Sequence, residues 1–590
     1  MATVRAQTPA GATSHRWEGD LTPIRAVDWN PTLARHLLNR AGFGAWGEEL
    51  EAFHALGASG AVARLVEHED VPNPLPPFVH SGVHDPGLEP FPPSRPATTR
   101  LAKTTGQALG VKVKPSGNRR LQPVVNRFFY WLRASRLETD RLAYWWANRM
   151  LTTRRPLQEK MALFWHGHFP INESKVRDYR KHLQLLEVFH EHGTANFRDL
   201  LIAVAKSPGM LAFLDAGVNI KGSPNENFAR EIMELFTMGV GRYRERDIRE
   251  AARAFTGWYF NDLRFVINAS KHDEGSKTFL GHSGPFDGIQ IIDLILAEPG
   301  TAEFVASKIY RYFVRDRVSP QTIAALGRVL RKYDYDLKPL LETIFLSRDF
   351  YSTATRSSRI KEPVEFVVST LKGLGLKTVP GVPDFNQATN ALGQRLFHPP
   401  TVAGWPQGRS WITPGLLIAR GNFARAVLFP DINFIPNDRY PTDPLIRGVS
   451  RRIALGYDIS TATIPEGKGG NLSMSNMMAD RDEDFNTRYG SYKGWQMALQ
   501  RVKPIVRDTA PVALWDTVAG AGVTSTREAV DFLAAHLLSV PVMADYRTLL
   551  VQILTEELGT EELARAATYA EEPLRRIAHL LMSSPEYQFN

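Results

Sequence analysis

Apolar residues recur with a helical period through most of this chain. The pattern begins at Leu33 and Leu37, and it predicts helices over much of residues 121–255, 288–374 and 527–584. Polar and charged side chains occupy the positions between, as on helices that bury one face in a shared core. The sequence therefore predicts a mainly α protein with a large multi-helix body.

The helical pattern is interrupted in three places. Residues 263–281 contain two short alternating runs around a turn-forming segment, which predicts a small β-hairpin. Residues 71–120 and 428–495 are rich in proline, glycine and polar residues, and both predict long irregular loops. We expect four segments, namely a disordered lead-in, a main helical domain, an irregular insertion, and C-terminal helices packed on the main body: residues 1–30, 31–427, 428–495 and 496–590.

The segment from Ser223 to Gly239 predicts a helix whose two ends are both encoded. Ser223 is a good N-cap, Pro224 suits the first helical position, and Glu226 completes a capping box. Gly239 supplies a left-handed stop. Apolar side chains at i, i+4 and i+7 from Phe228 predict that one face of this helix is buried.

A polar stripe beside that apolar face supplies the candidate catalytic residues. Asn227, Glu231 and Glu234 share the stripe, whereas Arg230 lies opposite as a candidate substrate-binding group. Arg230 is four residues from Glu226 and from Glu234, and we expect it to pair with both. Glu231 is then the carboxylate left desolvated, with a raised pKa. The hypothesis is that Glu231 acts as a general acid/base, assisted by Asn227 and Glu234; the alternative is a structural, salt-bridged helix.

Two histidine-containing segments supply candidate metal or acid/base groups. On a continuous helix His166 and His168 would point in opposite directions, but the glycine between them and Pro170 predict that the helix ends here. The two imidazoles would then face one side and bind a divalent metal; the alternative is a packed pair at a helix end. His272 and Asp273, at the tip of the predicted hairpin, are either an acid/base pair or part of a solvated turn.

A proline- and glycine-rich loop beginning at His398 carries candidate substrate-binding groups. Aromatic side chains on such a loop, here Trp405 and Trp411, either stack on sugars or bases or fill gaps between helices. Arg395 and Arg409 bracket the loop and are suited to bind a carboxylate or a phosphate.

Composition removes several classes of chemistry. The chain has no cysteine, which excludes disulfides, thiolate metal sites and cysteine nucleophiles. Its net charge of +9 is small for a chain of 590 residues. The charge therefore favours acidic substrates only weakly and indicates no nucleic-acid partner. No apolar run reaches the roughly 18 residues that span a bilayer, and the first residues lack the apolar segment of a signal peptide. The absence of phosphate-binding glycine loops argues against a nucleotide-dependent enzyme.

Several motifs occur in the same order as in a known bacterial family. They include Phe164-Trp-His-Gly-His-Phe169, Pro224-Asn-Glu-Asn-Phe-Ala-Arg-Glu231, Lys361-Glu-Pro-Val-Glu365 and Phe397-His-Pro-Pro-Thr-Val-Ala-Gly-Trp-Pro406. With these motifs the chain resembles the family called domain of unknown function 1800. The resemblance implies a mainly helical fold and no established reaction. Members are often encoded beside proteins that resemble sulfatases and alkaline phosphatases, and many are exported. It therefore favours an exported or envelope location and leaves a cytoplasmic one open.

The combined features favour a hydrolase-like, glycosidase-like enzyme that acts on an extracellular or envelope polysaccharide by carboxylate and histidine acid–base chemistry. One alternative is a non-catalytic binding or assembly partner of a neighbouring secreted, sulfatase-like protein. Another is a metal-dependent oxidoreductase with His166 and His168 among its ligands. Convergence of the candidate residues into one cleft would favour an enzyme, and dispersal would favour the partner.

Overall fold

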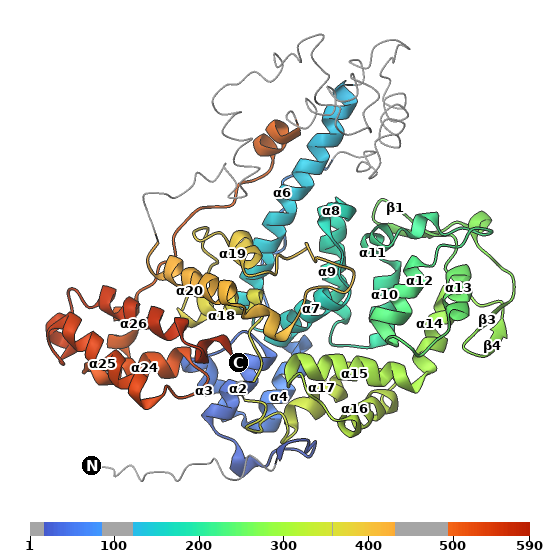
Figure 1. Ribbon diagram of the computed structural model, residues 1–590. Coiled ribbons are helices and arrows are strands. Elements are labelled where there is room, and N and C mark those ends of the chain that lie inside the picture. The colour runs from blue at the N-terminus through green and yellow to red at the C-terminus, as the bar shows by residue number, and fades with distance from the viewer. Residues whose placement is uncertain (1–16, 85–121, 357, 431–493) are drawn as a thin grey trace.

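Helices account for nearly all the regular structure of the chain (Figure 1). The computed structural model describes residues 17–84, 122–356, 358–430 and 494–590. It is 61% helical, and its strands form two short antiparallel hairpins. The predicted mainly α fold is therefore confirmed. Among the helices in these ranges, none is both long and apolar enough to cross a membrane.

The first helices form the base and the middle of the molecule in Figure 1, and the longest of them extends away from the body. They are η2 (Ala26–Asp28), α2 (Pro31–Ala41), α3 (Gly47–Ala55), α4 (Gly57–Val66), η3 (His68–Asp70), α6 (Gln122–Thr152), α7 (Pro156–His168), α8 (Glu173–Val176), α9 (Tyr179–His192), α10 (Phe197–Lys206), α11 (Pro208–Phe213) and η5 (Ala216–Val218).

Both hairpins lie at the right-hand side of Figure 1, where β1 contacts α11 and β3 contacts α13. The elements of this part are α12 (Asn227–Glu231), the π-helix η6 (Ile232–Thr237), α13 (Glu245–Ala254), β1 (Trp258–Asn261), β2 (Arg264–Ile267), η7 (Ala269–Lys271), β3 (Lys277–Phe279), β4 (His282–Gly284) and α14 (Gly288–Ala297).

The remaining helices cover the lower right, the centre and the left of the molecule (Figure 1). They are α15 (Pro299–Phe313), α16 (Pro320–Lys332), α17 (Leu337–Leu346), α18 (Pro363–Gly373), α19 (Phe385–Ala391), η8 (Gly408–Trp411), α20 (Pro414–Leu428), α23 (Leu514–Gly520), α24 (Thr526–Leu537), α25 (Ala544–Leu558), η12 (Leu563–Ala566), α26 (Glu571–Ser583) and η13 (Glu586–Gln588).

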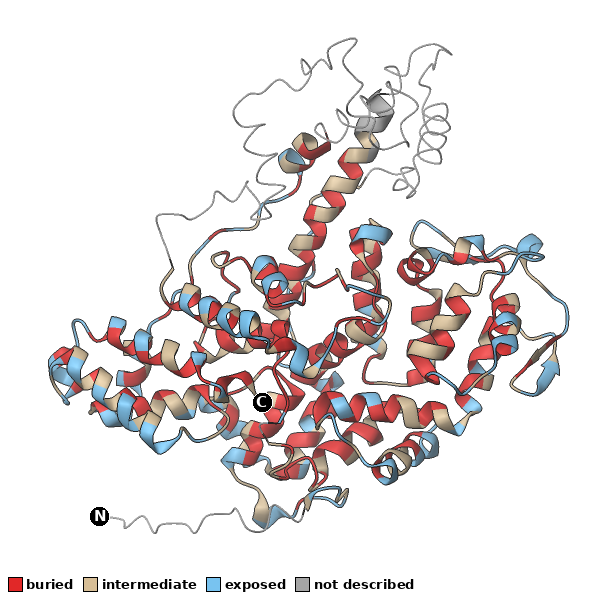
Figure 2. Ribbon diagram, viewed as in Figure 1, coloured by how far each residue is buried: buried red, intermediate tan, exposed pale blue. Residues whose placement is uncertain are grey.

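One apolar core joins helices from both ends of the chain. The residues coloured as buried in Figure 2 follow the inward faces of the helices, and a single apolar cluster contains residues from α2 through to α26. Local capping signals define many of these helices; Asn30, for example, accepts from the backbone N–H groups of Thr32 and Leu33 at the start of α2. α26 packs on α20, although the two helices are far apart in the sequence.

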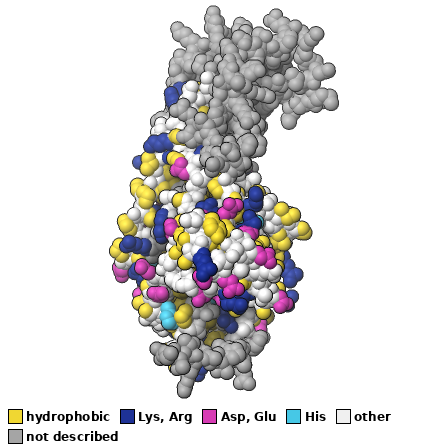
Figure 3. Space-filling model, turned by 90° about the vertical axis from the view of Figure 1, so that its left-hand side faces the viewer, with side chains coloured by type: hydrophobic (Ala, Val, Ile, Leu, Met, Phe, Trp, Pro, Cys, Tyr) yellow, Lys and Arg dark blue, Asp and Glu magenta, His cyan; other side chains and the backbone are white. Residues whose placement is uncertain are grey.

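The outer surface carries charges of both signs. On the face seen in Figure 3, the end of the molecule formed by α24–α26, basic and acidic side chains are intermixed with apolar ones. This face therefore shows no extended patch of one charge sign, which agrees with the small net charge of the chain relative to its length.

The predicted disordered lead-in requires correction over residues 17–30. Residues 17–30 are packed and not disordered, because the Gly19 N–H donates to Asp349 at 2.7 Å and the Ile24 N–H donates to the Leu346 carbonyl at 2.8 Å. Residues 1–16 of the lead-in, and 85–121 and 431–493 of the two predicted loops, lie outside the described residues.

The hairpin prediction has the correct location but the wrong pairing. The predicted runs at 264–268 and 277–280 do not pair with each other; β1 pairs with β2, and β3 pairs with β4. Asp262, with φ of 54°, supports the two-residue connection between β1 and β2. A short connection closes at less entropic cost than the longer loop that the sequence suggested.

A buried ionic hub lies where α7, α18 and the C-terminal segment meet. The Glu365 carboxylate accepts hydrogen bonds from Lys160 and from Asn590, from Arg359 at 2.8 Å and from the backbone N–H of Glu362 at 3.2 Å. Burial alone would raise the pKa of Glu365, but Arg359 and Lys160 lower it to about 2. Three segments far apart in the sequence are thus tied to one side chain.

Glu365→Gln should destabilise the protein by ~3–5 kcal/mol at neutral pH, since it leaves two buried cations without their charge partner. Urea unfolding monitored by circular dichroism measures the change. Because the folded pKa of about 2 lies below the ordinary value of 4.5, the stabilisation by Glu365 is present above pH 4.5 and is lost as the pH falls toward 2. Glu556→Gln, on an exposed helix face, is the matched control and should change stability by less than ~0.5 kcal/mol. Equal effects of the two variants would contradict the hub.

Candidate functional site

The capped helix begins later than the sequence predicts. Ser223 forms an isolated β-bridge with Ile220, and the first helical residue is Asn227. The Asn219 side chain fixes this segment by accepting from the Asn225 N–H at 2.9 Å. Gly239, with φ of 81°, is left-handed at the other end, as predicted. Ser223 as N-cap is therefore wrong, because these contacts within residues 219–225 hold the chain away from the helical path.

Most polar groups of this helix have structural partners. Asn227 donates to the Leu214 carbonyl at 3.2 Å, and Glu234 accepts from the Tyr243 hydroxyl at 2.8 Å. Arg230 pairs with Glu226 as predicted, at 3.0 Å, but its second partner is Glu245 at 2.8 Å. The expected Arg230–Glu234 pair is absent from the ion pairs of the described residues.

Glu231 differs from its neighbours. It is half-buried, and its carboxylate makes no hydrogen bond or ion pair with any side chain that the structure describes. Burial, followed by the charge of Glu234, raises its pKa, in the direction predicted from the sequence. It remains a candidate acid/base group without an orienting partner, since Asn227 is engaged elsewhere.

The segment around His272 and Asp273 forms a turn that several hydrogen bonds hold in place. His272 Nδ1 donates to the Thr256 carbonyl at 2.7 Å, and Asp273 accepts from Arg253 Nε at 2.8 Å. The hydrogen bond from Arg253 lowers the pKa of Asp273, so the carboxylate is ionised at neutral pH and serves as a hydrogen-bond acceptor. The buried Lys277 ammonium donates to the carbonyls of Asp273 and Gly275. These contacts match the turn alternative and do not bring this pair to the Glu231 helix.

The two loop tryptophans are core residues. Trp405 and Trp411 are buried together with Ile360, so neither offers an open face for stacking. Arg409 is exposed. The Gly404 backbone packs so tightly on α7 that an added Cβ would lie 2.2 Å from the Gly167 carbonyl oxygen. The glycine therefore serves close packing of the loop on α7.

The helix α7 continues through both of its candidate metal ligands. His166 and His168 accordingly point about 200° apart. His166 packs against Trp146 and Phe397, while His168 Nε2 donates to the Phe236 carbonyl of η6 at 3.0 Å. The predicted helix end before His168 is wrong, and the two imidazoles are not brought together. No group of three or more potential ligands is placed to hold an ion among the residues described.

A different set of groups meets around Phe397. The Phe397 ring lies between the rings of His166 and His182, with centroid distances of 5.0 and 5.4 Å. Its backbone N–H donates to His166 Nε2 at 3.1 Å, and its carbonyl accepts from the Glu173 N–H at 2.9 Å. A φ of 63° at a phenylalanine is strained, and such strain persists only where surrounding contacts enforce it.

The histidine cluster comprises His166, His182, His398 and Glu173. His182 Nε2 lies 3.1 Å from Glu173 Oε2, an ion-pair distance without a well-aligned hydrogen bond. Nδ1 of His182 and Nε2 of His398 are buried and have no hydrogen-bond partner within the described part of the chain. Four elements, α7, α8, α9 and the loop before Pro399, thus contribute one polar cluster inside the apolar core.

Arginines surround this cluster. Burial lowers the pKa of His398 well below its ordinary value, and Arg395, His182 and Arg136 lower it further. Burial, aided slightly by His182, lowers the pKa of His166 to about 3. Both imidazoles are therefore neutral at neutral pH. Because His166 Nε2 accepts from Phe397, its ring carries its proton on Nδ1.

The fold and this cluster define a mainly helical protein with a buried histidine–carboxylate centre. The chain belongs to the family described as Protein of unknown function (DUF1800), whose model matches residues 36–589. Neither the curated proteins nor the solved structures include a match to the chain. The resemblance drawn from the motifs is thus confirmed, and the chemistry must be argued from the site.

The sequence identified only part of the cluster. His166 was a candidate metal ligand, His398 began the tryptophan loop, and Arg395 was one of the two arginines that bracket this loop. His182 and Glu173 carry no local signal, because each occurs within an ordinary helical pattern. The one available clue was a histidine followed by two prolines, which fixes the loop backbone beside Phe397.

Glu231→Gln should retain or raise the melting temperature at pH 7. The raised pKa means that ionisation of Glu231 costs folded-state stability as the pH rises through and above the ordinary value of 4.5, and glutamine removes that cost. Thermal unfolding between pH 4 and pH 8 measures the effect. The control, Glu234→Gln, weakens the bond from Tyr243 and should lower stability. A Glu231→Gln variant that unfolds readily would instead identify Glu231 as half of an ion pair.

His166→Leu should destabilise the protein by ~1–3 kcal/mol more than His166→Gln. Leucine leaves the Phe397 N–H without an acceptor, whereas the glutamine amide oxygen replaces the imidazole nitrogen. Denaturant unfolding of the two variants measures the difference. Near-stoichiometric metal in the parent protein, lost in both variants by elemental analysis, would contradict a purely structural role for His166.

Proposed function

We propose that the chain is an acid–base enzyme of the hydrolase type whose reacting centre is the histidine cluster. The observation that carries the proposal is that His182 and His398 each have a buried ring nitrogen without a hydrogen-bond partner among the described residues. Buried polar groups are normally satisfied, so these nitrogens call for a ligand, a water molecule or a reacting group. The strained backbone at Phe397 is a second feature that recurs at active sites.

His398 is the proposed acid–base group. Its neutral ring accepts a proton from water at Nε2, and the water oxygen bonds to the electrophilic centre of the substrate. The bond from that centre to the leaving oxygen then breaks, and His398 returns the proton to that oxygen. The neighbouring pair of Glu173 and His182 is proposed to position His398 for this step.

The surrounding charge supports an anionic substrate. Burial lowers the pKa of Arg133 to about 10, and the neighbouring charges of Arg136 and Arg177 add to this effect. Burial is also the main cause of the lowered pKa of His398, which the positive charge of Arg395 and Arg136 lowers further, so His398 is a weak base in the free protein. A bound anion would offset that charge and raise the pKa of His398, so the base gains strength when substrate is present.

The polysaccharide part of the expectation has less support. Trp405 and Trp411 are buried, so the proposed substrate class rests on charge: an anionic ester or glycoside. Dispersal of the residues predicted around Glu231, His272 and His168 favours the alternative of a non-catalytic binding or assembly partner. The unpartnered imidazoles are the observation that favours an enzyme.

The test is hydrolysis of nitrophenyl esters and glycosides that carry a carboxylate, sulfate or phosphate group. The parent protein should release nitrophenol from at least one class, and His398→Gln should reduce kcat by roughly 10²–10⁴-fold. The matched control is His579→Gln, in α26, where the ring donates to the Gly421 carbonyl. Failure of the parent to hydrolyse any substrate, or equal rates in both variants, would favour the partner alternative.

A further inference from the structure

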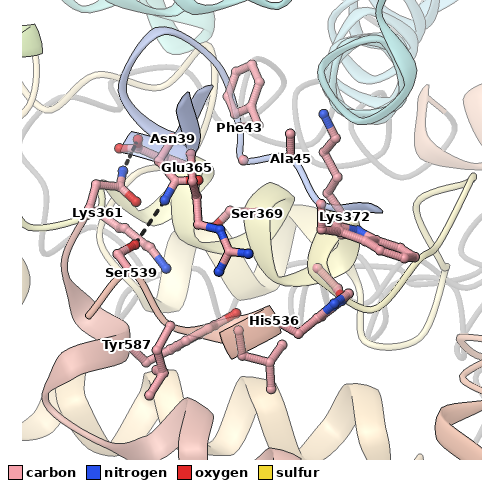
Figure 4. A pocket seen from close by; sticks show the side chains of 17 residues that line it. Asn39, Phe43, Ala45, Lys361, Glu365, Ser369, Lys372, His536, Ser539 and Tyr587 are labelled. Carbon is pink, nitrogen blue, oxygen red and sulfur yellow. Dashed lines mark hydrogen bonds between the residues drawn. The ribbon is translucent and has the colours of Figure 1, made fainter. Parts of the chain in front are cut away.

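A second polar site lies between α2, α18 and the segment that follows α24 (Figure 4). The cavity has a volume of ≈ 40 Å³, which accommodates about three water molecules or one small anion. It contains none of the histidine cluster. The polar groups that the argument uses are Arg35, Asn39, Lys361, Glu365 and Ser539, with the Tyr587 ring as one wall.

Lys361 is the unusual member of this lining. Its side chain is buried with 5% of the residue exposed, and its Nζ lies 4.0 Å from the centroid of the Tyr587 ring. Within the described residues, Nζ has no hydrogen-bond acceptor and no carboxylate at ion-pair distance. The nearby carboxylate of Glu365 is already occupied by Lys160 and Arg359. A buried ammonium without an acceptor is costly unless a ligand supplies one.

The buried charges around Glu365 do not balance. Counting side chains, five cations face two carboxylates: Arg40, Lys160, Arg359, Lys361 and Arg420 against Glu362 and Glu365. Both carboxylates bond to Arg359, whereas Arg40 and Arg420 donate to backbone carbonyls. Burial lowers the pKa of Lys361 to about 7, Arg420 and Lys160 add to this lowering, and Glu365 opposes them. An oxyanion in the cavity would supply the acceptor that Lys361 Nζ lacks.

Two further donors border the same space. The Arg35 guanidinium is half-buried and donates to the Ala535 carbonyl through Nη1, which leaves its other N–H groups available. The Ser539 Oγ accepts from Asn39 Nδ2 at 2.9 Å, so its own hydroxyl proton is free to be donated. An ammonium, a guanidinium and a hydroxyl around one small volume form a donor set for an oxyanion.

We propose that this cavity binds a small oxyanion, either a carboxylate or a tetrahedral phosphate or sulfate group, between Lys361 Nζ and the Arg35 guanidinium. The carboxylate of Glu365 holds Lys160 and Arg359 away from the ligand and leaves Lys361 as its cation. The site is separate from the histidine cluster, so its occupancy does not depend on the proposed hydrolase activity.

Isothermal titration calorimetry of the full chain with inorganic phosphate, sulfate or acetate, each against chloride at equal ionic strength, tests this site. At least one oxyanion should bind the parent protein, and Lys361→Met should weaken its binding by roughly tenfold or more. Arg35→Gln, at a half-buried position, should also weaken binding. Lys206→Met is the matched control, since Lys206 Nζ also lies over an aromatic ring, that of Phe265, and should bind as the parent does.

The same titrations identify the ligand chemistry. Tighter binding of acetate indicates a carboxylate ligand, and tighter binding of phosphate or sulfate indicates a tetrahedral one. His398→Gln should bind the anion as the parent does, which separates this site from the proposed active site. The inference is overturned if no oxyanion binds the parent better than chloride, or if both Lys361→Met and Arg35→Gln, shown to be folded by circular dichroism, bind with unchanged affinity.

Discussion

The requirement that buried charge be compensated organises the centre of this protein around Glu365. Lys160 comes from α7, Arg359 precedes α18, and Asn590 belongs to the C-terminal segment, yet all three donate to this one carboxylate. An uncompensated charge at this depth would cost several kcal/mol, so the three segments cannot separate without exposing it. The same requirement leaves Lys361 without a partner and thereby defines the oxyanion cavity.

The helix α7 connects this hub to the histidine cluster. Lys160 lies on it two turns before His166, so the orientation that pairs Lys160 with Glu365 also fixes the imidazole beside Phe397. His168 emerges on the opposite side and donates to η6, which anchors the segment that bears Glu231. One helix thus positions groups in three directions, and none of these groups shares a site with another.

Particular elements show how far the sequence could be followed. The apolar period that begins at Leu33 and runs through 121–255 does mark helices, among them α2 and α10, which begin at the local N-caps Asn30 and Asn196. The helix after Ser223 was misplaced, since Asn219 and a β-bridge to Ile220 outweigh the local capping box. Of the candidate site, the sequence identified His166 and the loop at His398, but assigned them to different chemistry. His182 and Glu173 were missed because a charged residue within a helical pattern does not reveal which neighbour it faces.

The sequence by itself determined the helical class, the family and the absence of thiol chemistry, because these follow from local periodicity, ordered motifs and composition. Only the tertiary structure decided which polar side chains are partnered. Glu234 and Asp273 are satisfied by Tyr243 and Arg253, whereas His398 Nε2 and Lys361 Nζ have no hydrogen-bond partner among the described residues. The physical reason is that desolvation and hydrogen bonding depend on atoms brought together from distant segments, and such proximity is a property of packing and not of sequence spacing.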